Sequence, residues 1–291
     1  MAELSPFLKE LRAFIRERAP QIIRVSEAYR DGDIKTLECM RVSPCQDVYS
    51  VAKTFTMTAI GLLFDRGKLR LDEKICDILS DDLPESGMDR RWRAATVEMA
   101  LTHRLGLPAG FLDIDVQPSS DFTENFLSYL LTFPLAYEPG TQARYSDGAY
   151  YLLARIVEKK AGMSLENFLW QEMLTKLDFQ ELAFSHCPRG HAIGATGLYA
   201  HSADMAKLGL LYLNGGLYRG KRILSETWTG MAVDKGYALD WYGQKCAYGK
   251  GGMFGQELLI IPKQHRVVAI QAFCDELDGI NDFIFSYGDR D

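Results

Sequence analysis

The sequence feature that most constrains the fold is an apolar run over residues 51–64 with a single ionisable side chain. The run lies within the segment DVYSVAKTFTMTAIGLLFDRG. Between residues 51 and 64, Lys53 is the only residue with a charged side chain. Wound as a helix, the run is apolar on nearly every face, and such a helix is buried in a protein core. It is too short for the roughly 20 residues that cross a bilayer. The sequence therefore predicts a buried helix from Ser50 to Arg66 that stops before Gly67.

Lys53 is an unusual residue for such a helix, because removing an ammonium group from water costs several kcal/mol. Ser50 precedes it by three residues, so the two share one helix face about one turn apart. Ser50 also lies at the helix start, where free N–H groups stabilise a developing anion. Burial lowers the pKa of a lysine, and a neutral amine can accept the serine proton. The pattern indicates a nucleophile beside its base; the alternative is a lysine whose head group reaches solvent.

Charge and composition exclude several classes of partner. The formal net charge is −6 and the pI is near 5.5, so the chain lacks the basic surface that suits nucleic acid or an anionic membrane. The N-terminal stretch MAELSPFLKELRAFIRERAPQ is amphipathic and heavily charged. It predicts a helix that begins after Ser5 rather than a secretory signal. We therefore expect a cytoplasmic protein with neither nucleic acid nor membrane as a partner, and its oligomeric state is not predictable from these features.

Cysteine and histidine usage favours reduced thiols and no metal. The six cysteines include no CxxC pair, and without export reduced thiols are expected. The one local cluster is His186, Cys187 and His191 in SHCPRGH. Its spacing matches no standard zinc pattern, so we interpret it as a turn around Pro188 and Gly190.

The order of predicted elements indicates an α+β protein. Residues 21–42 are typical of two strands, and ELLIIP and RVVAIQAF indicate two more near the C-terminus. Helical spacing predominates between them, for example in TVEMALTHRLGL and GAYYLLARIVEKKAG, and LDGINDFIFSYG predicts a closing helix. We expect a largely antiparallel sheet flanked by helices, with an inserted helical subdomain. The expected division is a sheet lobe of residues 1–66 and 181–291, with the nucleophile helix at its interface, and a helical lobe of residues 67–180.

Two further motifs follow SVAK in the order that serine β-lactamases and penicillin-binding proteins share. Tyr145-Ser146-Asp147 stands before a predicted helix, and Lys250-Gly251-Gly252 stands before a predicted strand. Together with LLFDRGKLRLDEKI, LTHRLGLP, YEPGT and GLYAHSADMAKLGLLYLNGG, they make residues 45–275 resemble the class C β-lactamase-like serine hydrolases. That family includes penicillin-binding proteins, carboxylesterases and D-amino-acid peptidases. The resemblance implies a β-lactamase/transpeptidase-like fold and no cofactor.

The resemblance also implies a role for each matching residue. Ser50 would be the nucleophile that forms an acyl-enzyme, Lys53 its hydrogen-bonded base, and Tyr145 the group that moves protons to the leaving group or from water. The backbone N–H groups of Ser50 and Met253 would form the oxyanion hole. The expected substrate contacts are Asp147, Lys250, Gly251 and Gly252.

Two departures from the family pattern bear on the substrate. Asp147 stands where the family usually has asparagine, and a carboxylate cannot donate to a substrate carbonyl and favours a charged Lys53. Gly251 lacks the hydroxyl of KTG. We therefore expect a serine hydrolase of small esters, with β-lactams and D-aminoacyl amides as further candidate substrates.

Two other readings remain open. The same departures suit a catalytically degenerate, penicillin-binding-protein-like protein that binds ligands and keeps the fold. A Ser-His-Asp hydrolase is disfavoured, because the sequence has no GxSxG elbow and its five histidines fall mostly in predicted loops.

Overall fold

The computed structural model describes residues 3–18, 21–30, 32–274, 277 and 279–290. Contacts along the chain divide it into two compact units. The sheet unit comprises Met1–Val51, Met173–Ala183 and Leu198–Asp291, and the helical unit comprises Ala52–Glu172 and Phe184–Gly197. The division expected from the sequence kept the helix after Ser50 with the sheet, whereas this grouping assigns that helix to the helical unit.

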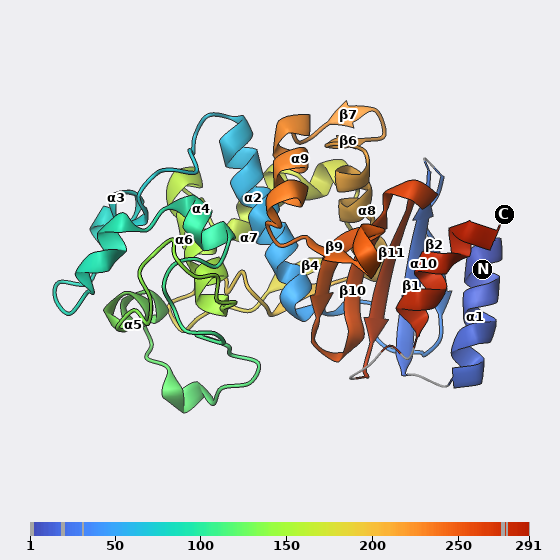
Figure 1. The fold of residues 1–291 in the computed structure, drawn as a ribbon, viewed down its shortest axis with the longest axis horizontal. Helices are drawn as coiled ribbons and strands as arrows, with labels where there is room; N and C mark the ends of the chain where they lie inside the picture. The colour runs from blue at the N-terminus through green and yellow to red at the C-terminus, as the bar shows by residue number, and fades with distance from the viewer. Residues whose placement is uncertain (1–2, 19–20, 31, 275–276, 278, 291) are drawn as a thin grey trace. The chain divides into compact units, whose positions relative to one another are not determined.

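An antiparallel sheet joins strands from both ends of the chain (Figure 1). Its order is β2 (Lys35–Glu38), β1 (Ile22–Tyr29), β11 (Arg266–Ala272), β10 (Gln256–Ile261), β9 (Ala247–Gly252) and β8 (Asp240–Tyr242). Each neighbouring pair runs antiparallel. The α+β class and the antiparallel sheet predicted from the sequence are therefore confirmed.

Helices cover both faces of this sheet, because successive side chains of a strand point to opposite sides. The helices of the sheet unit are α1 (Pro6–Arg18), α8 (Ser202–Leu213), α9 (Glu226–Lys235) and α10 (Ile280–Ser286). Val268 and Ile270 of β11 belong to a buried cluster with α1 and α10. Val267 faces α8, where a Cβ on Gly209 would come within 2.4 Å of its Cγ1. A glycine at 209 therefore allows α8 to lie close against the sheet.

The helical unit is built around the apolar run identified in the sequence. Its helices are α2 (Ala52–Asp65), α3 (Ile75–Ile78), α4 (Val97–Leu101), α5 (Phe126–Thr132), α6 (Asp147–Ala161) and α7 (Leu165–Glu172). Every residue of α2 from Ala52 to Leu63 is buried, which confirms the predicted helix. Thr56 of α2 donates a hydrogen bond to the carbonyl oxygen of Gly194 at 2.7 Å. A Cβ on Gly194 would lie 2.7 Å from the Cβ of Ala154 on α6, so this glycine lies between the two helices.

Two smaller sheets complete the fold. One has the order β3 (Gln46–Asp47), β5 (Leu198–Ala200) and β4 (Leu182–Phe184), and the other pairs β6 (Leu217–Tyr218) with β7 (Lys221–Arg222). β3 leads directly into the 3-10 turn η1 (Tyr49–Val51), which contains Ser50. The N–H of Val48 donates to the carbonyl of Leu198 at 2.8 Å, so the strand before the turn is fixed to β5.

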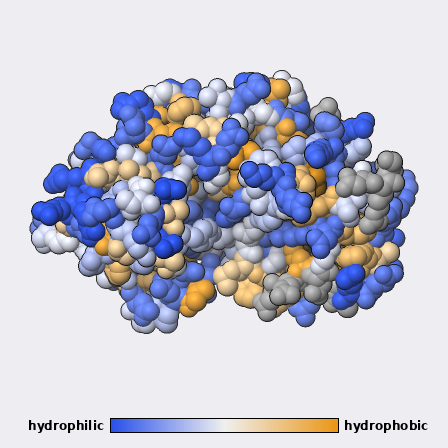
Figure 2. Space-filling model, viewed as in Figure 1, coloured by the Kyte–Doolittle hydropathy of each residue, from blue (hydrophilic) through white to orange (hydrophobic). Residues whose placement is uncertain are grey.

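Some of the large apolar side chains that the structure describes are exposed. Hydrophilic residues predominate over the region of α3 in Figure 2. Val116 and Phe273 are the most exposed large apolar side chains, at 67% and 61%. The Phe273 ring stacks on that of Phe254, with their centres 5.2 Å apart. Exposed apolar residues are common on protein surfaces. Within the part of the chain that the structure describes, none of the helices is both long and apolar enough to cross a membrane.

Candidate active site

Lys53 lies in the first turn of α2 with its ammonium group in the protein interior. The residue is 0% exposed, and its Nζ lies 2.7 Å from Oδ1 of Asp147, the first residue of α6. Nζ also donates to the carbonyl oxygen of Ala195 at 2.8 Å, and it lies 4.8 Å from the centre of the Tyr145 ring. The alternative of a lysine that reaches solvent is therefore wrong. The helical unit brings together three predicted site residues, Lys53, Tyr145 and Asp147.

The charge state of Lys53 differs from the one expected for a buried lysine. Burial disfavours the ammonium form, but the carboxylate of Asp147 and the phenol of Tyr145 outweigh burial and raise the pKa of Lys53 above its ordinary value. The prediction that burial leaves this amine neutral is therefore wrong. It gave burial more weight than the pairing with Asp147, which the sequence had also suggested, and the fold places that carboxylate 2.7 Å from the amine. At neutral pH Lys53 rests as a cation in an ion pair.

The Tyr145 ring packs against His103, a residue that the sequence placed in the helical segment TVEMALTHRLGL and to which it gave no role. The rings of His103 and Tyr145 lie 4.6 Å apart at 35°, and Nδ1 of His103 accepts the N–H of Ser146 at 3.3 Å. The carbonyl of His103 accepts the N–H of Arg144 at 2.8 Å. These contacts fix the backbone on both sides of Tyr145. Tyr145 itself is 42% exposed. His103 is therefore a positioning residue, and its one sequence signal is its place in the family phrase LTHRLGLP.

Ser50 lies in the middle of a tight turn that is constrained at its first residue. Tyr49 has a φ of 47°, in the left-handed region, and its N–H donates to Oδ1 of Asp47 at 2.8 Å. The N–H of Val51 donates to the carbonyl of Val48 at 3.1 Å. α2 begins at the next residue, so Ser50 and Lys53 belong to one continuous helical run, η1 followed by α2.

The end of β9 lies against the turn that holds Ser50. A Cβ on Gly252 would come within 2.5 Å of the carbonyl oxygen of Val48 and 3.1 Å of the Cβ of Tyr49. Just beyond it, the Phe254 ring meets the Tyr49 ring at 5.3 Å and 67°. Gly252 is thus required for close approach of two backbones. The sheet unit brings the turn of Ser50 and the segment of Gly252 and Met253 side by side.

Lys250 has a partner that the sequence did not suggest. Its Nζ lies 2.7 Å from Oδ2 of Asp240 on the neighbouring strand β8, and the residue is 6% exposed. Gly251 differs from Gly252 in its surroundings, because a Cβ there would meet the hydroxyl of Tyr242 at an ordinary 3.4 Å. The missing side chain at 251 is therefore not required by packing within this sheet.

Comparison with known proteins identifies the family. The family model described as Beta-lactamase matches residues 40–275. This chain belongs to the β-lactamase family. An N-acetylmuramyl-L-alanine amidase of Bacillus subtilis (strain 168) is 23% identical over 79% of this chain and 68% of its own length. Penicillin-binding protein 4 of Amycolatopsis lactamdurans is 26% identical over 76% of this chain and 70% of its own.

The structural comparison agrees with the family assignment. A penicillin-binding protein homologue from Caulobacter crescentus has the same fold, with a TM-score of 0.76 at 14% identity over 99% of both chains. The resemblance identified from the sequence motifs is therefore confirmed. Members of the β-lactamase family are serine hydrolases such as amidases and β-lactamases, and this chain is a hydrolase-family protein of that fold.

Two carboxylates beside Asp147 belong to no family motif and were not predicted. Oxygens of Asp113, Asp115 and Asp147 lie within 4.8 Å of one another. Burial, together with the charge of Asp147, raises the pKa of both Asp113 and Asp115. Thr196 donates a hydrogen bond to Asp115 and so opposes this rise. The region around Lys53 therefore has an excess of carboxylates over the single ammonium.

The cluster His186, Cys187 and His191 forms the predicted turn. The N–H of Gly190 donates to the carbonyl of Cys187 at 2.8 Å. The three side chains contact three different partners. His186 pairs with Glu166 at 2.6 Å, the Cys187 sulfur lies 3.6 Å from the Tyr151 hydroxyl, and His191 pairs with Glu158 at 2.9 Å.

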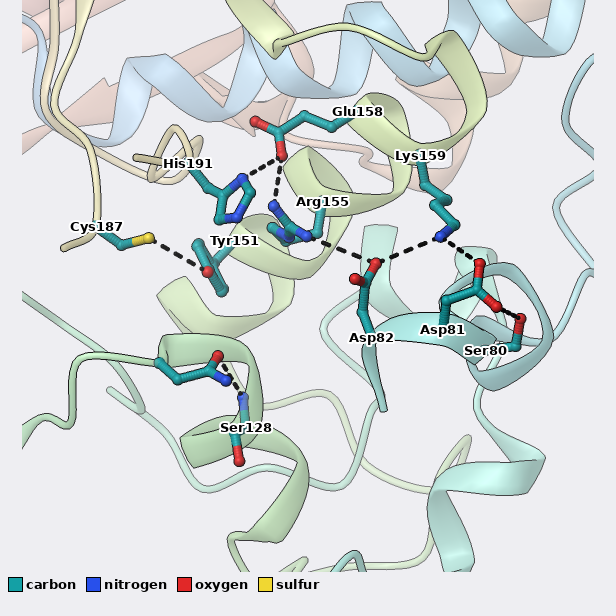
Figure 3. Close-up of polar contacts among 11 residues, drawn as sticks. Ser80, Asp81, Asp82, Ser128, Tyr151, Arg155, Glu158, Lys159, Cys187 and His191 are labelled. Carbon is teal, nitrogen blue, oxygen red and sulfur yellow. Dashed lines mark hydrogen bonds and ion pairs between the residues drawn. The ribbon is translucent and has the colours of Figure 1, made fainter. Parts of the chain in front are cut away.

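Figure 3 shows that His191 and Glu158 belong to a larger polar network on α6. Arg155 pairs with Glu158 at 2.7 Å and lies 3.7 Å from Asp82, which also lies 3.7 Å from Lys159. The network borders a cavity of about 320 Å³. Its acidic and basic groups pair with one another, so we interpret it as support for α6, whose first turn carries Asp147.

The sequence leads us to expect an oxyanion hole that includes the N–H of Met253 and a serine hydrolase of esters. On that expectation Gly252→Ala should lower kcat/KM for an ester by up to about 10²- to 10³-fold, the usual cost of losing one oxyanion donor. The added methyl group would overlap the Val48 carbonyl and push β9 away from the turn of Ser50. Steady-state kinetics with a nitrophenyl ester, together with a thermal unfolding curve, measure the effect. Gly230→Ala on α9 is the matched control, because a Cβ there meets nothing within 4 Å. Wild-type kcat/KM in folded Gly252→Ala protein would contradict this expectation.

Proposed function

We propose that this β-lactamase-family chain is a serine hydrolase that forms an acyl-enzyme on Ser50 and acts on small esters. The observation that carries the proposal is the buried ammonium of Lys53, paired with Asp147 at 2.7 Å and flanked by the Tyr145 ring. Replacing a buried ion pair with apolar residues is often neutral or stabilising, so stability alone gives little reason to keep one in an apolar helix. A buried, perturbed lysine close to a candidate nucleophile in sequence instead suits proton transfer.

In the proposed reaction, the Ser50 oxygen attacks the carbonyl carbon of the substrate while its proton passes to the neutral amine of Lys53. The N–H groups of Ser50 and Met253 bind the carbonyl oxygen as it becomes negative. Tyr145 passes a proton to the leaving group and takes one back from the water that hydrolyses the ester bond to Ser50. Lys53 then returns its proton to the Ser50 oxygen. The position of Ser50 and Lys53, three residues apart in one helical run, supports the first proton transfer.

The resting charge of Lys53 makes the proposed reaction dependent on pH. Lys53 can accept a proton only after it has lost its own, and its pKa is raised. The fraction of enzyme with a neutral Lys53 therefore grows as pH rises towards that pKa. We expect kcat/KM to increase with pH through the neutral range.

The departures from the family pattern support esters, rather than less reactive acyl compounds such as amides, as the substrates. Asp147 cannot donate a hydrogen bond to a substrate carbonyl, and Gly251 offers no hydroxyl to a substrate carboxylate. Esters have better leaving groups than amides and need less assistance. β-Lactams and D-aminoacyl amides follow as slower candidate substrates.

A covalent probe tests the proposal directly. The Ser50 oxygen should displace fluoride from a fluorophosphonate, so that the protein gains the mass of one phosphonyl group, and peptide mapping should place this group on Ser50. Ser50→Ala should lose both the label and hydrolysis of nitrophenyl esters. Undiminished hydrolysis by Ser50→Ala would exclude Ser50 as the nucleophile.

The second candidate function is that of a ligand-binding protein without turnover. The observation that favours it is the same ion pair, because a lysine held as an ammonium is no base. This candidate predicts no acylation by fluorophosphonates, β-lactams or activated esters at any pH up to the alkaline range. It also predicts saturable ligand binding that Ser50→Ala leaves intact. Labelling at Ser50 would decide against it.

The carboxylates near Lys53 predict a preference for substrates that carry a positive charge. An aminoacyl nitrophenyl ester with a free ammonium should have a kcat/KM several-fold higher than its N-acetylated counterpart, as expected for charges near a protein surface. Asp113→Asn with Asp115→Asn should reduce that ratio towards one, because both carboxylates lie close to Asp147. Added salt should weaken the preference in wild type. A ratio unchanged by the double substitution would show that these carboxylates do not select the substrate.

A further inference from the structure

A thiol, an imidazole and a carboxylate lie together where the three strands of the small sheet in the sheet unit begin or end. Cys45 precedes β3, Glu181 precedes β4, and His201 follows β5. The strand order is β3-β5-β4, and Gln46 of β3 pairs with Ala200 of β5 in antiparallel register. The first residues of β3 therefore lie beside the last residues of β5. One candidate ligand atom from each of the three side chains lies within 4.8 Å of the other two.

This set of donor atoms suits a zinc ion. Zinc binds thiolate, imidazole and carboxylate in tetrahedral sites, with bonds of about 2.0–2.2 Å to nitrogen or oxygen. Those bond lengths require two such ligand atoms to lie about 3.3 Å apart. Nε2 of His201 and Oε2 of Glu181 form a hydrogen-bonded pair at 3.2 Å, a separation that two ligands of one zinc ion also have. Three protein ligands leave the fourth position to water or to another ligand.

Electrostatics at the same place favour a cation. Glu181 and Asp204 both place negative charge near the Cys45 sulfur. Without a cation, a thiolate here would be repelled by both carboxylates, and a divalent cation between them reverses that repulsion. Asp204 itself pairs with Lys207 at 2.7 Å and accepts the N–H of Gln180 at 3.1 Å, so it steadies the chain next to Glu181.

The backbone around the three residues is fixed by hydrogen bonds, which reduces the entropy that a bound ion must overcome. The N–H of Val48 bonds to the carbonyl of Leu198 at 2.8 Å, and Nε2 of Gln271 donates to the carbonyl of Ala200 at 2.9 Å. β3 then continues into the turn of Ser50. An ion bound to Cys45 would therefore fasten the strand that precedes this turn.

We propose that Cys45, Glu181 and His201 form a binding site for Zn²⁺ that joins the starts of β3 and β4 to the end of β5. The site does not depend on the proposed hydrolase function, because none of its residues takes part in that reaction. Its role is to stabilise the sheet unit next to the turn of Ser50. Binding converts the Cys45 thiol to a zinc thiolate and releases its proton to solvent, so affinity should increase with pH.

Cobalt substitution tests the site, because a thiolate ligand and a tetrahedral geometry each give bound Co²⁺ a characteristic absorption. The full chain, freed of metal with a chelator under reducing conditions, is titrated with Co²⁺. We expect a thiolate-to-cobalt charge-transfer band in the near ultraviolet and visible bands of tetrahedral cobalt, saturating at one equivalent and abolished by added Zn²⁺. Cys45→Ser should lose the charge-transfer band. Cys39→Ser, which removes an exposed thiol outside the cluster, should keep it.

Two further measurements keep the proposal falsifiable if Cys45→Ser folds poorly. Glu181 has a side chain that is 64% exposed, so Glu181→Gln should fold normally. We expect it to weaken cobalt binding at least as much as the loss of an outer-shell partner does, about 10- to 100-fold. In wild type, Zn²⁺ should protect Cys45 alone among the six cysteines from alkylation, as measured on peptides. A charge-transfer band that survives Cys45→Ser, protection of a different cysteine, or no saturable band would overturn the proposal.

Discussion

Lys53→Met is expected to abolish ester hydrolysis and also to destabilise the protein. Loss of a general base lowers kcat/KM by about 10²- to 10⁴-fold, and Lys53 is the group that we propose takes the proton from Ser50. The side chain of Asp147 is 6% exposed, and the substitution removes the ammonium 2.7 Å from it. Breaking a buried pair in this way costs about 3–5 kcal/mol in the free energy of unfolding. Kinetics with nitrophenyl esters and denaturant unfolding at neutral pH measure the two effects.

The double substitution Lys53→Met with Asp147→Asn separates the two effects. It removes both charges, so most of the lost stability should return while activity stays absent. The pKa of Lys53 is raised in the folded state, so the stabilisation by the pair is complete below the unfolded value of about 10.4 and is lost as pH rises through the folded pKa. A neutral-pH measurement therefore captures all of it. Activity within about tenfold of wild type in Lys53→Met would rule out the proposed base.

Asp147→Asn is expected to accelerate ester hydrolysis at neutral pH. The carboxylate of Asp147 is the leading group that raises the pKa of Lys53 against the effect of burial. Without it, burial lowers that pKa, and the neutral amine becomes populated nearer to neutrality. Each unit by which the pKa falls increases the neutral fraction about tenfold at a pH below it. We expect the acid limb of the kcat/KM profile to move down by at least about one pH unit.

The measurement is a pH–rate profile of kcat/KM for a neutral ester from about pH 6 to the alkaline limit of stability. Asp113 and Asp115 keep part of the negative charge near Lys53, so the shift should grow when they are also replaced by asparagine. Asp72→Asn, which removes an exposed carboxylate of the helical unit, is the control and should leave the profile unmoved. An acid limb that stays in place or moves upward in Asp147→Asn would show that this carboxylate does not set the protonation of Lys53.

The sequence was most informative where a pattern is local. An apolar run with no polar face must be buried, and α2 is buried from Ala52 to Leu63. Alternating and β-branched residues predicted the strands near both termini, and these pair in one antiparallel sheet. Local pattern failed for TVEMALTHRLGL, where helix α4 ends at Leu101. His103 adopts a φ of 55° there and makes its hydrogen bonds with the backbone of Arg144 and Ser146. Tertiary contacts overrode a helical spacing.

The sequence by itself determined the buried helix, the serine and lysine three residues apart at its start, and membership of the β-lactamase family. The first two features depend on neighbours along the chain, whose relative positions the helical repeat fixes, and the third is carried by the order of the motifs in the sequence. The tertiary structure decided whether burial or Asp147 sets the charge of Lys53, and it alone placed Asp113 and Asp115 beside Asp147. It also decided the meeting of Cys45, Glu181 and His201. A pKa depends on charges a few ångströms away in space, and residues far apart in the chain reach that distance only when packing and strand pairing bring them together.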